Sequence, residues 1–253
     1  MTEISRRRAM TAMLAGSAAG LGLPATNARA TEPLAAVDQR PGQCILLPQA
    51  IEGPYYFDPT LLRSDIAEGR PGAPLRLALR VIESGSCTPI TGARVDVWHA
   101  DAEGIYSGYA LQGPDESVST QGQTYLRGTQ MTGSDGRVSF TTIYPGWYPG
   151  RTPHIHVKVF LDDKSLVTGQ MYFPDDFTGR IYASREPYTA RAKADTTNAA
   201  DGIFRDGERD GGGTVLAMSE ESGTILAALV IGVDRSGAAA QPGQSFWRRL
   251  LGQ

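Results

Sequence analysis

The chain has 253 residues, of which 41% are hydrophobic and 20% are charged, and its formal net charge is −3. This length suits one domain with appendages and is enough to build a hydrophobic core without disulfide support. The slight excess of acidic residues disfavours nucleic acid and anionic membrane surfaces as partners.

The first thirty residues have the composition of an export signal. Arg6, Arg7 and Arg8 precede an apolar run over residues 9–23, and residues 28–30 form a small-x-small cleavage site. The arginines predict the twin-arginine route. An ordinary secretory signal and a retained membrane anchor are the alternatives, although the apolar run is shorter than the roughly 20 residues of a spanning helix. We therefore expect a periplasmic or extracellular protein with no stable membrane insertion after signal removal.

Removal of residues 1–30 makes the chain more acidic. This segment holds four of the 24 lysines and arginines and one of the 27 acidic residues, which leaves 20 basic and 26 acidic residues and a formal net charge of −6. Residues 31–73 are predicted to form an N-terminal approach segment. It contains Cys44, and the only other cysteine is Cys87. An oxidising compartment favours a disulfide between them, and two buried free thiols remain the alternative.

Residues 74–234 are predicted to form the catalytic domain. Apolar residues alternate along Pro74–Glu83, which is typical of a strand with one buried face. Further strands are predicted at Gly92–Trp98, Val138–Thr142, Ile155–Leu161, Thr168–Phe173, Thr214–Met218 and Thr224–Val233. This pattern predicts an all-β protein, a β-sandwich of mostly antiparallel strands with long active-site loops.

Three long connections interrupt these strands. Residues 101–124 are polar and glycine-rich, and residues 145–153 are rich in proline and glycine. Long loops on a rigid β scaffold commonly carry function. Residues 175–213 are expected to be irregular, with a helical turn around residues 189–194. Residues 235–253 are expected to be a C-terminal tail.

Two of the three histidines, His154 and His156, begin a predicted strand. Residues two apart on a strand point to the same face, so both imidazoles would lie side by side. This is a metal-ligand arrangement, although a pair of structural histidines would show the same spacing. The pair alone does not identify a metal.

An ordered set of motifs surrounds this pair. Along the chain stand Gly104-Ile-Tyr106, then Tyr148-Pro, then Arg151-Thr-Pro-His154-Ile-His156. Over roughly residues 52–173 the chain resembles the intradiol ring-cleavage dioxygenases, which include protocatechuate 3,4-dioxygenase and the catechol dioxygenases. Each motif is weak by itself, but the ordered set is specific.

The resemblance implies a function and a ligand set. Tyr106, Tyr148, His154 and His156 would bind one non-haem ferric iron per chain, because phenolates are hard anionic ligands and imidazole also suits iron. The substrates would be a catechol-type diol and O₂, and the product a cis,cis-muconate-type diacid. Tyr148 would leave the iron when the catechol binds and would accept one of its protons.

Two further residues occupy positions that the family uses. Arg151 would stabilise charge that develops on the substrate ring, and Gln170 would lie near the bound oxygen. His99 matches no family ligand and is expected to be structural. Tyr109 competes with Tyr106 as a ligand, and Gly104 favours Tyr106.

Two other functions remain open from the sequence. His99, His154 and His156 together would suit a zinc hydrolase-like site. A non-catalytic β-sandwich that binds an aromatic or a carbohydrate is the non-enzyme alternative. The sequence also leaves the oligomeric state open, with a homodimer as one candidate assembly.

Overall fold

The computed structural model describes residues 44–58, 60–191 and 193–237. The predicted export signal at residues 1–30 lies outside these residues, as do residues 31–43 of the approach segment and residues 238–253 of the C-terminal tail. No helix among the described residues has the length and apolarity required to cross a membrane.

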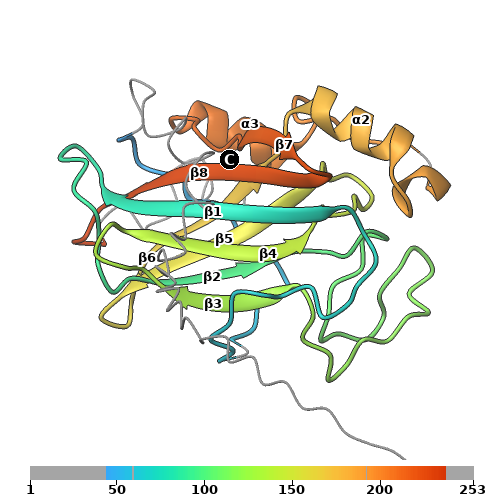
Figure 1. Cartoon of the computed structure of the whole chain (residues 1–253), viewed down its shortest axis with the longest axis horizontal. Coiled ribbons are helices and arrows are strands. Elements are labelled where there is room, and N and C mark those ends of the chain that lie inside the picture. Colours follow the sequence, from blue (N-terminus) through green and yellow to red (C-terminus); the bar gives the residue numbers. More distant parts are fainter. Residues whose placement is uncertain (1–43, 59, 192, 238–253) are drawn as a thin grey trace, which may run out of the picture.

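The described residues form two stacked sheets of four strands each (Figure 1). The first sheet has the order β4-β1-β8-β7 and the second has the order β3-β2-β5-β6. All strand pairs are antiparallel except β1 with β8. The predicted β-sandwich is therefore confirmed. The strands are β1 (Pro74–Glu83), β2 (Arg94–Trp98), β3 (Arg127–Met131), β4 (Arg137–Ile143), β5 (His154–Leu161), β6 (Lys164–Tyr172), β7 (Ala217–Glu221) and β8 (Thr224–Val233).

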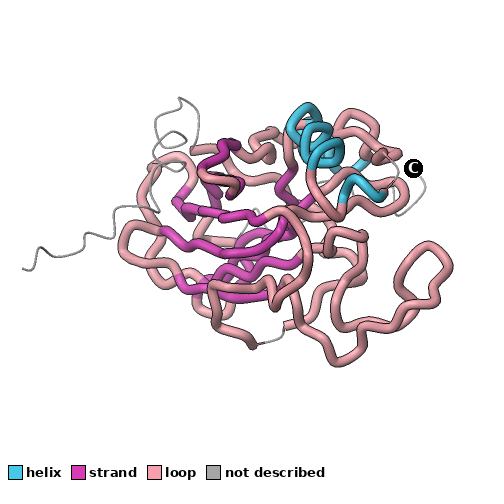
Figure 2. Tube along the Cα trace, turned by 45° about the vertical axis from the view of Figure 1, so that its right-hand side comes forward, coloured by secondary structure: helices cyan, strands magenta, loops and turns pink. Residues whose placement is uncertain are grey.

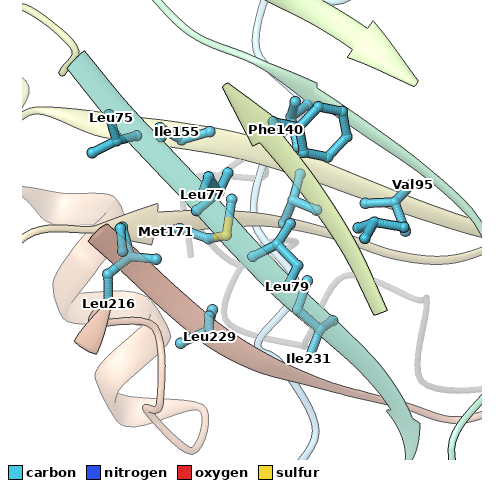
Figure 3. Packing of buried hydrophobic residues seen from close by; sticks show 14 of the residues in the cluster. Leu75, Leu77, Leu79, Val95, Phe140, Ile155, Met171, Leu216, Leu229 and Ile231 are labelled. Atoms are coloured by element: carbon cyan, nitrogen blue, oxygen red, sulfur yellow. The ribbon is translucent and has the colours of Figure 1, made fainter. Parts of the chain in front are cut away.

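The core lies between the two sheets (Figure 3). Alternate residues of β1, namely Leu75, Leu77 and Leu79, are at most 1% exposed, as the sequence pattern predicts. Val95 of β2 and Ile155 of β5 meet them from the second sheet. Because the period of a strand is two, the residues between these apolar positions point away from the core.

A disulfide joins Cys44 to Cys87, which settles the alternative that the sequence left open. It ties the approach segment to the turn that follows β1. The same segment pairs with both sheets, since Leu47 N donates to Gly232 O of β8 and Ala50 N donates to Thr168 O of β6. The segment is thereby fixed along the edge of the sandwich.

The prediction that residues 175–213 are irregular is wrong for two helices, and the helical turn expected around residues 189–194 is present as a short 3-10 turn that begins one residue earlier. The helices are α2 (Asp175–Ser184) and α3 (Gly202–Arg209), and the turn is η1 (Tyr188–Ala190). Figure 2 shows the helices gathered beside one end of the strands. Only three residues of α2 and one of α3 are buried, and the helices are only ten and eight residues long, so their apolar positions are too few to predict them.

Three strands also differ from the prediction. β6 begins at Lys164 rather than at Thr168. The sequence predicts no strand at the position of β3, because Arg127-Gly-Thr-Gln-Met131 has no apolar alternation. It lies at the edge of its sheet, where such residues are tolerated. β7 runs over Ala217–Glu221 rather than residues 214–218. Glu220 and Glu221 are exposed and polar, so a hydrophobicity pattern does not predict where this strand ends.

Candidate metal centre

The candidate site lies on the outer face of the second sheet, at one end of its strands. Val157 of β5 points into the core, so its neighbour His156 points outward. The register places Trp98 of β2 and Gln170 of β6 on either side of His156, and Tyr172 opposite His154. The loops that follow β2 and precede β5 extend from this end, at the right of Figure 1.

The structure brings the four predicted ligand residues together. The Nε2 atoms of His154 and His156 are 3.2 Å apart, and the Tyr148 hydroxyl lies 3.2 Å from His154 Nε2. The Tyr106 hydroxyl lies 3.5 Å from that of Tyr148. Two oxygens and two nitrogens thus lie in series, each within 3.5 Å of the next, in the order Tyr106, Tyr148, His154, His156.

Local contacts orient both imidazoles. His154 Nδ1 donates to Thr152 O at 2.7 Å, which leaves the lone pair on Nε2. His156 stacks on Trp98 with ring centroids 4.7 Å apart and an interplanar angle of 11°. Burial lowers the pKa of both histidines well below the usual value, and positively charged Arg151 lowers it further. Both rings are thus neutral, which is the form that binds metals.

Burial has the opposite consequence for the two phenols. It raises the pKa of Tyr106 well above its usual value, and the neighbouring Tyr148 oxygen raises it further. Burial also raises the pKa of Tyr148, although Arg151 opposes this effect. Two adjacent phenolates would therefore require a cation of high charge between them.

The spacing of the four donor atoms fits one metal ion. Two donors that share an ion at about 2.0–2.1 Å lie about 2.8–3.5 Å apart when the angle between the bonds is about 90–115°. The observed separations of 3.2 and 3.5 Å fall in this range. The donor set of two phenols and two imidazoles suits ferric iron better than zinc, because phenolate is a hard anionic ligand.

His99 does not join this group. Its Nδ1 donates to Ala100 O and its Nε2 accepts from the Thr142 hydroxyl of β4, each at 2.8 Å. The described residues, which include all three histidines, contain no group of three His, Cys, Asp or Glu residues that could hold a metal. The alternative of a three-histidine zinc site is therefore contradicted.

Tyr109 also lies outside the donor group, because its hydroxyl donates to Tyr56 O at 3.0 Å. Gly104 explains why Tyr106 is the inner tyrosine. Its φ is +83°, and a Cβ there would lie 2.2 Å from Trp147 O. Only glycine allows the loop that carries Tyr106 to approach the loop that carries Tyr148 this closely.

Arg151 and Gln170 lie beside the phenol of Tyr148. Arg151 Nη1 is 3.3 Å from the Tyr148 hydroxyl, and Nη2 donates to Gln170 Oε1. Gln170 Oε1 also accepts from the Tyr172 hydroxyl at 2.9 Å. The structure thus places Arg151 next to the donor group and Gln170 next to Arg151.

Sequence reasoning missed two parts of the site. Tyr55 of the approach segment stacks on Tyr106 with ring centroids 4.6 Å apart, a contact that the sequence pattern does not indicate. Asp201 accepts from Arg151 Nε at 2.8 Å. Its only signal in the sequence is an Asp at the start of a short helix, which is typical of an ordinary N-cap.

Comparisons with known proteins agree with this geometry. A family model described as Dioxygenase matches residues 51–195. The structure of an intradiol ring-cleavage dioxygenase from Tetranychus urticae matches with a TM-score of 0.68 and 32% identity, covering 76% of this chain and 96% of that one. The dioxygenase domain of a dioxygenase carbohydrate-binding protein fusion from Streptomyces sp. SirexAA-E matches with a TM-score of 0.54 and 27% identity, covering 75% and 99%.

A curated relative has a similar level of identity. The protocatechuate 3,4-dioxygenase beta chain from Burkholderia cepacia is 34% identical over 160 residues, which cover 56% of this chain and 66% of the relative. The first three curated relatives are matched over only 51–66% of their own length. The family model and the Tetranychus urticae structure together confirm the predicted family: the chain belongs to the intradiol ring-cleavage dioxygenases.

Proposed function

We propose that this protein is an iron(III)-dependent intradiol dioxygenase. It would cleave catechol-type diols with O₂ between the two hydroxyl-bearing carbons and give cis,cis-muconate-type diacids. The observation that supports this most strongly is the series of two phenol oxygens and two imidazole nitrogens in which each donor atom lies within 3.5 Å of the next. Tyr106, Tyr148, His154 and His156 would hold the iron, which, when bound, would make the catecholate reactive towards O₂.

Tyr148 is suited to accept a proton from the substrate. It is the only partly exposed member of the donor group, whereas the other three residues are buried. A tyrosine phenolate is a strong base, because free tyrosine titrates at about 10, and burial raises the pKa of Tyr148 further in the metal-free protein. The catechol hydroxyl proton would transfer to Tyr148 Oη as the substrate enters.

Arg151 and Gln170 would orient the substrate. The guanidinium places a fixed positive charge beside Tyr148 Oη, where negative charge develops on the ring as it reacts. Gln170 is held by Tyr172 and, through its Nε2, by Ile51 O at 3.3 Å. Its amide group would therefore keep one orientation during the reaction.

The proposal is tested with purified protein loaded with iron. Metal analysis should give one iron per chain, and phenolate-to-iron charge transfer should colour the protein burgundy. Oxygen-electrode assays across catechol, protocatechuate, hydroxyquinol and halogenated catechols, with product spectra, should show uptake and a muconate-type product. A non-catalytic aromatic- or carbohydrate-binding sandwich predicts neither bound iron nor oxygen uptake, so a protein that stays colourless with added iron would refute the proposal.

We also propose that the protein works outside the cytoplasm. The disulfide between Cys44 and Cys87 supports this, because such bonds persist in oxidising compartments. Residues 1–30 fused to a reporter should direct export that stops when the twin-arginine translocase is disabled. Export that continues without this translocase would contradict the route.

A further inference from the structure

Arg151 is held at three points of its guanidinium. Its Nη1 lies 3.3 Å from the Tyr148 hydroxyl and its Nη2 donates to Gln170 Oε1, so two corners face the site. The third corner, Nε, donates to Asp201 Oδ2 at 2.8 Å. Because the guanidinium is planar and rigid, a bond at Nε fixes where both Nη atoms point.

Asp201 is itself held firmly. The residue is fully buried. Its Oδ1 accepts from Ile203 N and Phe204 N, at 2.8 and 3.2 Å, and so caps α3. Its Oδ2 accepts from Thr152 N at 3.1 Å in addition to Arg151. The carboxylate therefore joins the start of α3 to Arg151 and Thr152, which stand three and two residues before His154.

The geometry points to a role for this carboxylate in the reaction. We propose that Asp201 is a positioning residue, which holds the Arg151 guanidinium in the orientation that faces Tyr148 and Gln170. Without the bond to Nε, the side chain of Arg151 could rotate toward solvent, since it is 16% exposed. Misplacement of a catalytic group by about 1 Å can cost a factor of about 10² in rate.

This role extends the site beyond the matched family segment, which ends at residue 195. Residues 197–201 and α3 form a strap over the loop at Arg151. Asn198 supports the same strap, because its Oδ1 accepts from the Thr152 hydroxyl at 2.9 Å. Phe204 of α3 packs edge-on against Tyr172, with centroids 5.0 Å apart, next to Gln170. The inference rests on the proposed function.

The test replaces the charge and keeps the helix cap. Asp201→Asn retains a good N-cap residue but presents an amide N–H to Arg151 Nε. We expect kcat/KM for a catechol substrate to fall about 10²-fold, with kcat carrying most of the loss. The visible band of the iron-loaded protein should be unchanged, since none of the four donor residues is altered. Asp201→Ser is the substitute variant if Asp201→Asn folds poorly. Serine also caps helices but cannot reach Arg151, so the same loss of kcat/KM and the same visible band are expected.

Two controls separate positioning from general support of the fold. Asp206→Asn makes the same chemical change on α3, away from Arg151, and should stay within about twofold of the parent. In an Arg151→Gln background, Asp201→Asn should reduce kcat/KM by less than about threefold, because there is no guanidinium left to position. An equal loss in both backgrounds, or a single variant within threefold of the parent, would overturn the proposal.

A measurement on the metal-free protein makes the test independent of catalysis. The Arg151 Nε–H resonance, assigned by its loss in Arg151→Gln, should be protected from solvent exchange in the parent and lose at least tenfold of this protection in Asp201→Asn. Unchanged exchange would refute the contact. If the iron-loaded parent consumes no oxygen with any catechol, the proposed function fails, and the exchange result still decides whether Asp201 holds Arg151.

Discussion

His99 should make the fold sensitive to acid. It is fully buried, and burial lowers its pKa to about 4, helped by the positive charge of Arg127 and opposed by its bond to Ala100 O. An unfolded histidine titrates near 6.5. Between these values only the unfolded chain binds the proton, so the stabilising contribution is complete above pH 6.5 and is lost as the pH falls towards 4. The loss is about 2 kcal/mol at pH 5 and about 3 kcal/mol at pH 4.

The assay compares the parent with His99→Gln, both loaded with metal so that His154 and His156 are held as ligands. Urea unfolding at several pH values gives the free energy of unfolding of each protein. The difference between parent and variant should shrink by about 2 kcal/mol from pH 7 to pH 5. The variant should keep its metal and its visible band, because His99 contacts Thr142 and Ala100 rather than the donor group. A difference that does not change with pH, or a variant that loses its metal, would refute this reasoning.

Three further outcomes are expected. Tyr148→Phe should bind iron through the three remaining donors and keep a weaker phenolate band, while kcat falls about 10²–10⁴-fold because the proton acceptor is lost; an unchanged kcat would contradict its role. Tyr109→Phe is the matched control and should leave both band and kcat within twofold. Reduction of the Cys44–Cys87 disulfide, which spans 43 residues, should lower the free energy of unfolding by up to about 4 kcal/mol in denaturant titrations, and an unaltered midpoint would show that the closed loop contributes nothing.

The strands that could be predicted are those whose side chains face the core. β1 and β8 match their predicted ranges, Pro74–Glu83 and Thr224–Val233, because their inward residues are apolar over ten positions. β3 could not be predicted, since its stability comes from hydrogen bonds at the edge of the sheet and not from an apolar face. α2 and α3 were not predicted for a related reason, because each helix buries few side chains.

In the site, residues that lie close together in the sequence could be predicted, whereas a contact between distant residues could not. His154, His156 and Tyr148 lie within nine residues of one another, and Tyr106 could be found from its local motif. Asp201 is 50 residues from Arg151, and only the folded chain brings them together. A lone aspartate before a short polar segment carries no sign of a distant partner, so this contact could not be found by pattern.

The candidate site lies on the outer face of the second sheet, and the approach segment covers it and buries its side chains. Tyr55 covers Tyr106, and a Cβ on Gly53 would lie 3.7 Å from His156 Cε1, so the backbone of this segment passes directly over the donor group. Metal ligands on this face leave the core between the sheets undisturbed, because Ile155 and Val157 fill it from the same strand. The burial that keeps both imidazoles neutral, and both phenols protonated while no metal is bound, therefore depends on a segment outside the strands, which the disulfide at Cys44 anchors. Reduction of that disulfide should consequently weaken iron retention against a chelator as well as lower stability, whereas retention that is unaffected in the reduced, folded protein would show that the pairing of this segment with β6 and β8 is sufficient.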